Sequence, residues 1–185
     1  MKKHLVCIIV FCLFPKIISA QKLSVSTNIL DWANLATINT QVSYAVSQHF
    51  DINSGFRYNN WNFALNGNPF QNRARTAYAG VRYWPWNVYS GYWFDFRLQA
   101  EEYNRGGLPT MDYTEEGDAL GCGVGLGYSR MLSHHLNLDF GIGLWAGRTR
   151  YTRYACPRCG RITDRGKRFF CLTDDNVKVA LVYIF

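Results

Sequence analysis

Hydrophobic and polar residues alternate with a period of two along most of the chain after residue 21. This period is typical of a β-strand with two unlike faces. Segment 136–150 shows it most clearly: Leu138, Phe140, Ile142, Leu144 and Ala146 oppose Asn137, Asp139, Gly141, Gly143 and Gly147. Turn signals divide the chain into eight such segments: 22–33, 36–48, 50–61, 75–84, 92–103, 118–131, 136–150 and 176–185. The pattern therefore predicts an all-β, antiparallel protein with an even number of strands.

The composition of the polar face favours a barrel in an outer membrane. A soluble lipocalin-type barrel turns its apolar face inward, whereas an outer-membrane barrel turns it outward against lipid. Glycine crowds the polar face, which suits a narrow interior and would weaken a solvent-facing strand. We expect an eight-stranded antiparallel transmembrane β-barrel with a lumen filled by side chains. A soluble periplasmic, lipocalin-like binding barrel is the alternative.

Charges of both signs also lie on the polar face. Because an unpaired buried charge is costly, we expect them to pair inside the barrel. A solvated face with mixed charges is the other interpretation. The expected lumen network consists of Arg57, Arg82, Asp95, Arg97, Glu101 and Asp139. Aromatic residues gather between residues 83 and 93, where we expect an interface girdle rather than a soluble core cluster.

The first twenty residues have the three-part plan of a cleaved secretory signal. Lys2 and Lys3 precede an apolar run over residues 5–14, and small residues follow at Ser19 and Ala20. We expect residues 21–185 to form one domain. Removing residues 1–20 lowers Lys plus Arg from 20 to 17 against 13 acidic residues, which leaves a net charge of +4.

The chain ends in a strand pattern whose last aromatic positions are Tyr183 and Phe185. This ending resembles the C-terminal signal that the barrel-insertion machinery of Gram-negative outer membranes reads. Together with the export signal, it predicts a location in the outer membrane, in contact with outer-membrane lipid.

Several short blocks resemble the domain-of-unknown-function family 3575. The blocks are Asn28–Asp31 with Ala33–Leu35, Phe56–Trp61, Val81–Trp84, Gly121–Tyr128 and the Cys156/Cys159–Gly160 segment. The resemblance implies a small outer-membrane barrel of Bacteroides-type bacteria, with some members encoded near genes for fimbria-like appendages. The family pattern Asn-Pro-Trp is Asn59–Asn60–Trp61 here, so the proline is missing. The resemblance brings no catalytic residues.

Loop lengths agree with a periplasmic N-terminus. The inner turns, near 48–50, 85–91 and 131–135, are short, as outer-membrane barrels require. The outer loops include three long ones, near 61–75, 104–118 and 150–176.

The last of these loops, 150–176, is strongly basic. Its cations could bind lipid phosphates, acidic surface glycans or another surface protein, and export argues against nucleic acid. A solvated loop over anionic lipid is the plainer interpretation. The candidate residues are Arg153, Arg158, Arg161, Arg165, Lys167 and Arg168.

The same loop contains Cys156 and Cys159 in a C-x-x-C motif, with Cys171 nearby. We favour a disulfide that holds the loop, since no fourth ligand completes a structural zinc site. A metal site formed by Cys156, Cys159 and Cys171, and free thiols, are the alternatives. Cys122 could also pair with a loop cysteine, and sequence does not fix the connectivity. We expect no cofactor.

Candidate catalytic groups are few. Ser129, Ser133, His134 and His135 form the one local cluster that could serve a lipid-modifying enzyme, and they fall near a turn that would not fix their geometry. Carboxylates such as Asp95 and Asp139 are flanked by arginine, which favours ion pairing over acid–base chemistry. We therefore expect a non-enzymatic protein of the cell envelope with a surface, structural or interaction role.

Overall fold

A computed structural model describes residues 22–33, 37–65, 68–107, 113–155, 160–172 and 177–185. The expected export signal, residues 1–20, lies outside them. No helix in these ranges is long and apolar enough to cross a membrane. In chain order the described elements are β1 (Leu23–Asn28), α2 (Ile29–Ala33), β2 (Ile38–Ala45), β3 (Phe50–Leu65), β4 (Asn68–Tyr83), β5 (Gly91–Gly106), β6 (Thr114–Ser133), β7 (Leu136–Tyr154), β8 (Ile162–Leu172) and β9 (Lys178–Ile184).

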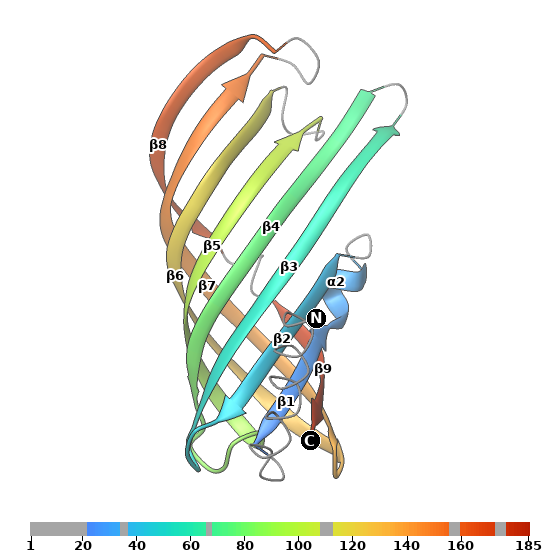
Figure 1. Cartoon of the computed structure of the whole chain (residues 1–185), viewed down its shortest axis with the longest axis vertical. Helices are drawn as coiled ribbons and strands as arrows, with labels where there is room; N and C mark the ends of the chain where they lie inside the picture. Colours follow the sequence, from blue (N-terminus) through green and yellow to red (C-terminus); the bar gives the residue numbers. More distant parts are fainter. Residues whose placement is uncertain (1–21, 34–36, 66–67, 108–112, 156–159, 173–176) are drawn as a thin grey trace, which may run out of the picture.

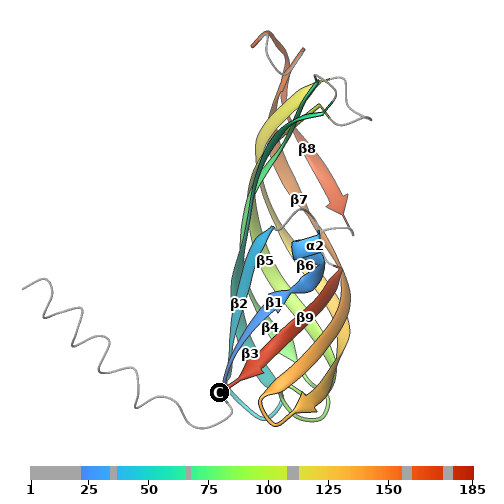
Figure 2. The same cartoon turned by 90° about the vertical axis from the view of Figure 1, so that its right-hand side faces the viewer.

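Eight of the strands close into an antiparallel barrel, which confirms the expected all-β, eight-stranded antiparallel barrel. Neighbours in sequence pair from β1 to β7, and β9 pairs with both β7 and β1 (Figures 1 and 2). Closure depends on the pairing of β1 with β9, in which Val25 lies opposite Tyr183. β8 lies outside this ring and pairs with the upper half of β7.

The apolar face of the barrel points outward. Phe94 and Phe96 are 52% and 53% exposed, whereas Asp139 on the opposite face is 1% exposed. This arrangement is the one predicted, and it is opposite to that of a lipocalin-type barrel. Glycines on the inner face give space to large side chains. A Cβ atom at Gly127 or Gly141 would overlap the ring of Trp93, which is 4% exposed.

The lower end of the barrel has short turns and an aromatic plug. Trp84 is fully buried and its Nε1 donates to Asp51 Oδ2 at 2.6 Å. The Tyr89 hydroxyl donates to the backbone oxygens of Lys22 and Ser43, and burial raises the pKa of Tyr89 to about 12. The girdle prediction is therefore wrong for Trp84, Tyr89 and Trp93, which lie inside. Tyr83, Trp86 and Tyr92 are exposed, as a girdle requires.

The first predicted strand, 22–33, is shorter than expected. It ends at Asn28, whose Oδ1 accepts a hydrogen bond from the backbone N–H of Leu30 at 3.3 Å. A side-chain oxygen at this position caps the start of a helix. α2 therefore replaces the end of the strand.

The prediction of three long outer loops is also wrong, because most of their residues belong to strands. β3 and β4 pair as far as Leu65 and Asn68, and β5 and β6 pair as far as Arg105 and Glu115. The expected loop 150–176 contains the end of β7 and all of β8, paired with each other from Trp145–Leu172 to Tyr154–Ile162. Backbone hydrogen bonds between neighbouring strands order these polar segments as a continuous sheet.

We name residues 59–65, 68–74, 101–107, 113–119, 145–155 and 160–172 the upper sheet. These parts of β3–β8 extend past the ends of β1, β2 and β9, so one side of the wall is tall and the other low (Figures 1 and 2). Within the described residues, β8 has no partner on its second edge. The inner face of the upper sheet is thus open to one side.

Candidate functional site

Arg82 lies at the centre of an ion network in the closed barrel. Its Nε is 3.7 Å from Asp95 Oδ1, and its Nη1 is 3.4 Å from Asp139 Oδ2. Lys178 Nζ lies 3.9 Å from the same Asp139 oxygen. The guanidinium carbon of Arg82 is also 4.4 Å from the ring centre of Trp93. Mutual pairing offsets the cost of burying these charges.

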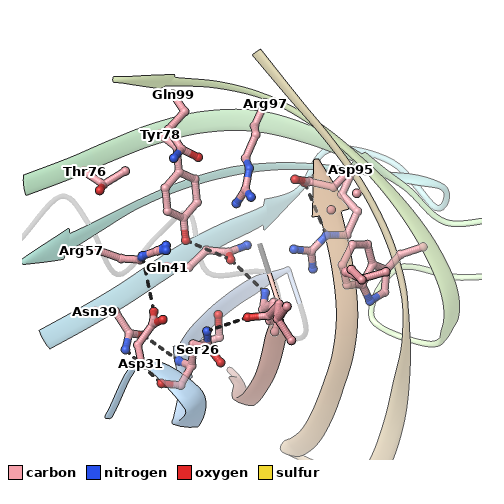
Figure 3. Close-up of a pocket in the computed structure, with 18 residues that line it drawn as sticks. Ser26, Asp31, Asn39, Gln41, Arg57, Thr76, Tyr78, Asp95, Arg97 and Gln99 are labelled. Carbon is pink, nitrogen blue, oxygen red and sulfur yellow. Dashed lines mark hydrogen bonds and ion pairs between the residues drawn. The ribbon is translucent and has the colours of Figure 1, made fainter. Parts of the chain in front are cut away.

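A second set of polar side chains fills the lumen above Arg82. Arg57 Nε lies 3.6 Å from Asp31 Oδ2, and the Arg97 guanidinium lies 5.1 Å from the ring centre of Tyr78. The Tyr78 hydroxyl donates to Gln41 Oε1 at 3.3 Å. Figure 3 shows these side chains converging from opposite walls. The space left between them is about 50 Å³, which holds about one or two water molecules. The lumen is thus filled and leaves no solute pathway here.

All six residues of the expected lumen network lie on the inner face. Glu101 differs from the others, because its Oε1 pairs with Arg105 Nη2 at 2.7 Å near the barrel mouth. Sequence reasoning missed Asp31 and Trp93. Asp31 lies in a helix, where strand alternation gives no signal, and Trp93 resembled a girdle residue.

Glu115 organises a polar cluster on the inner face of the upper sheet. Its side chain is 2% exposed and accepts hydrogen bonds from Arg153 Nε at 2.8 Å and Tyr103 Oη at 2.9 Å. Arg168 donates to both carboxylate oxygens, at 3.1 and 2.5 Å. The hydrogen bond to Glu115 raises the pKa of Arg153. Burial, and then the hydrogen bond to Glu115, raise the pKa of Tyr103. The sequence singled out Arg153 and Arg168 but not the carboxylate that joins them.

A pocket of about 290 Å³ lies beside this cluster. The rings of Trp145 and Phe170 meet edge to face in its wall, with centroids 4.4 Å apart. Trp145 Nε1 is buried without a hydrogen-bond partner in the described structure. The lining consists of Glu101, Tyr103, Arg105, Tyr113, Glu115, Ala119, Trp145, Thr149, Arg168, Phe170 and Leu172. Guanidinium donors, carboxylate acceptors and aromatic rings together can bind a small polar ligand such as a sugar ring.

The six cations of the expected basic loop do not form one surface. Two of them bind Glu115 on the inner face, as described above. Arg165 and Lys167 point outward, since they pair in register with Thr152 and Arg150 of β7. Arg161 is exposed just before β8, and Arg158 lies outside the described residues. A strand sends successive side chains to opposite faces, which separates the set.

Cys122 and Cys171 are free and exposed. They lie on the outer face on either side of Ala146, two strands apart, at about 9–10 Å between Cα atoms. A disulfide needs less than about 7 Å, so these two cannot join. The C-x-x-C pair Cys156 and Cys159 lies outside the described residues. Within those residues, no group of three or more His, Cys, Asp or Glu side chains could hold a metal ion.

The candidate catalytic side chains are dispersed. Ser129 is buried on the inner face and accepts a hydrogen bond from Asn137 at 3.2 Å. Ser133, His134 and His135 are exposed near the β6–β7 turn. The ring of His135 pairs instead with a backbone oxygen of β9. No hydrogen bond joins Ser129 to His134 or His135, all of which are described.

The predicted assembly signal lies at the seam of the barrel. Tyr183 and Phe185 point outward, 48% and 45% exposed, with ring centroids 5.0 Å apart. Tyr183 belongs to β9, which closes the barrel against β1. Recognition of these residues by the insertion machinery stays a prediction.

Comparison with known proteins identifies a protein family but no individual relative. No curated protein and no solved structure matches the chain. A family model described as "Protein of unknown function (DUF3575)" matches residues 5–185. The chain therefore belongs to the DUF3575 family.

Proposed function

We propose that this protein is a non-enzymatic integral protein of a Gram-negative outer membrane. Its sealed barrel anchors the upper sheet on the external side, where the sheet binds a surface glycan or another surface protein. The observation that carries the proposal is that the outer face of the barrel is apolar while its inner face is charged. Apolar side chains such as Phe94 and Leu144 are exposed outside, while ion pairs fill the inside. Water would penalise that outer face, whereas acyl chains would solvate it.

Further features support the external binding role. The pocket beside Glu115 combines charge and aromatic rings, and the filled lumen argues against a porin. The separation of Ser129 from His134 favours a non-enzymatic role over lipid modification. A link to fimbria-like appendages stays part of the proposal, on the family resemblance alone. Nucleic acid is not among the proposed partners.

Thiol accessibility tests the membrane proposal. The full chain, carrying Cys156→Ser and Cys159→Ser, would be expressed in a Gram-negative host and recovered with its membranes. We expect an outer-membrane fraction, a band that migrates faster before heating, and Cys122 and Cys171 that resist a charged, water-soluble maleimide until the protein is denatured. Asn60→Cys, on the outer face of the upper sheet, is the matched control and should react at once. Recovery in the soluble periplasmic fraction, or immediate labelling of Cys122, would refute the proposal.

A further inference from the structure

The exposed apolar side chains on the outer face of the barrel, among them Phe94, Val124 and Leu144, form what we name the apolar belt. A groove of about 860 Å³ crosses the outer face of the sheet at the upper limit of this belt. It exists because two neighbouring strands carry only a methyl group at the same level. Ala77 of β4 pairs with Ala100 of β5, and larger side chains stand on either side: Phe56 of β3 and Leu120 of β6. The floor of the groove is therefore apolar and about two strands wide.

One side of this groove carries an unbalanced group of cations. Arg148 and Arg150 follow each other on the outer face of β7, and Lys167 lies directly opposite Arg150 on β8. Arg75 lies across the groove on β4 and stacks on Tyr58, 5.7 Å from its ring centre. With Glu102 and Asp118 between them, these side chains carry a net charge of +2.

None of these six exposed side chains forms an ion pair within 4.0 Å in the described structure. Cations placed directly opposite each other on neighbouring strands are destabilising. Asp118 lies opposite Arg150 on β6 and offsets the charge of that arginine, which leaves Lys167 on β8 and Arg148 one row below without an opposite acid. A bound anion would offset these remaining cations.

Arg148 fixes the position of that anion relative to the apolar belt. It lies between Leu120 and Phe169, which are 68% and 71% exposed and are its register partners on β6 and β8. Its guanidinium thus emerges from an apolar row and can reach the polar row above it, as arginine does at a lipid boundary. A lipid presents the same order, with acyl chains below and a headgroup phosphate above.

We propose that this groove binds a membrane lipid with an anionic, phosphate-bearing headgroup. An acyl chain lies along Ala77 and Ala100, and the phosphate oxygens accept hydrogen bonds from Arg148, Arg150 and Lys167. Guanidinium groups suit phosphate because they offer paired donors in a fixed plane. This inference rests on the proposed membrane location and adds the class of lipid that the outer face selects.

The test measures lipid binding by the purified full chain in a nonionic detergent. Phosphatidylglycerol and phosphatidylcholine are titrated separately, and bound lipid is counted by native mass spectrometry. We expect a preference for phosphatidylglycerol that falls about 10- to 100-fold in the triple variant Arg148→Gln, Arg150→Gln, Lys167→Gln. A matched triple variant, Arg73→Gln, Arg130→Gln, Arg165→Gln, removes the same charge elsewhere and should retain the preference within about twofold.

A second pair of variants tests the groove itself. Ala100→Leu fills the floor and should weaken phosphatidylglycerol binding, whereas Ala79→Leu, on the outer face one row lower, should not. Equal affinity in the two triple variants would overturn the inference, as would complete displacement of the lipid by millimolar inorganic phosphate, which would indicate a free-anion site. The heat-dependent gel shift separates the two failures. If the unaltered chain lacks the shift, the proposed membrane location fails; if the shift is present without lipid preference, only this inference fails.

Discussion

The closed barrel and the upper sheet are built from the same strands but differ in their outer faces. Along β7, the outer face carries Phe140 and Leu144 in the barrel and then Arg148 and Arg150 above it. The inner faces differ little, since both contain buried carboxylates held by arginine. Asp139 has this role below and Glu115 above.

This comparison separates two requirements that act on one sheet. The inner face must satisfy its buried charges at every level, because an unpaired charge is costly wherever water is excluded. The outer face instead follows the solvent it meets. The boundary between its two parts follows the register of the strands, with Ala100 and Leu120 on one row and Glu102 and Asp118 on the next. Changes on either face should therefore have different costs in the two regions.

Loss of the lumen cation should have the largest effect. Arg82→Met leaves Asp95 without its cation and weakens the pairing of Asp139, which should lower the free energy of unfolding by about 3–5 kcal/mol. Arg153→Met, in the more exposed cluster above, should cost about 1 kcal/mol. Urea unfolding in lipid vesicles measures both. Equal losses would mean that the two ion clusters are equally buried in the folded protein.

A charge introduced on the outer face should give the second-largest difference in stability between the two regions. Val124→Arg places a cation in the apolar belt and should cost about 2–4 kcal/mol in vesicles. Asn60→Arg, on the outer face of the upper sheet, should change stability by no more than about 0.5 kcal/mol. A negligible cost for Val124→Arg would contradict contact between the belt and lipid.

Glycine on the inner face gives a smaller contrast. Gly127→Ala should cost about 1–3 kcal/mol, because the new methyl group would overlap the Trp93 ring and the backbone oxygen of Phe140. Gly166→Ala in β8 should cost close to nothing, since its nearest neighbour is the Tyr151 hydroxyl, at 3.0 Å, at the end of a side chain that can move. Thermal unfolding of the two variants compares them. A larger loss for Gly166→Ala would show that the upper sheet is the more tightly packed region.

The smallest effect should appear only at high pH. Tyr89 has a pKa of about 12 in the folded barrel, against about 10 in an unfolded chain. The unfolded state therefore loses its proton first, and stability falls as the pH rises from 10 through 12. Tyr89→Phe should lose less stability than the unaltered protein between pH 9 and pH 11.5. The urea midpoint of each protein is measured at both pH values. An equal change in midpoint in Tyr89→Phe and in the unaltered protein would mean that Tyr89 is in contact with solvent.

The sequence predicted the barrel because its two faces contrast strongly in the lower region. Leu138 and Asp139, or Phe94 and Asp95, differ enough to reveal a period of two. In the upper sheet both faces are polar, so Arg150 and Tyr151 give no such contrast. Successive side chains still alternate between the two faces there, but the sequence shows no contrast in hydrophobicity. Segment 150–176 therefore resembled a loop.

The residues of the two proposed binding sites were only partly predictable for a related reason. A run of arginines is visible in the sequence, but its division between Glu115 and the outer groove depends on which face each side chain occupies. Glu115 carries no local signal, because its partners Arg153 and Arg168 come from two later strands. The groove depends on Ala77 and Ala100 being adjacent, which only strand register decides.

The unequal height of the wall has a consequence for what can reach the pocket beside Glu115. β1, β2 and β9 end well below β3–β8, so the inner face of the upper sheet opens sideways while the lumen below it is plugged (Figure 2). A lateral opening admits the middle of a long polymer without threading a free end. Under the proposed binding role, a polysaccharide or an extended peptide would therefore dock through an internal stretch and remain continuous on both sides of the protein.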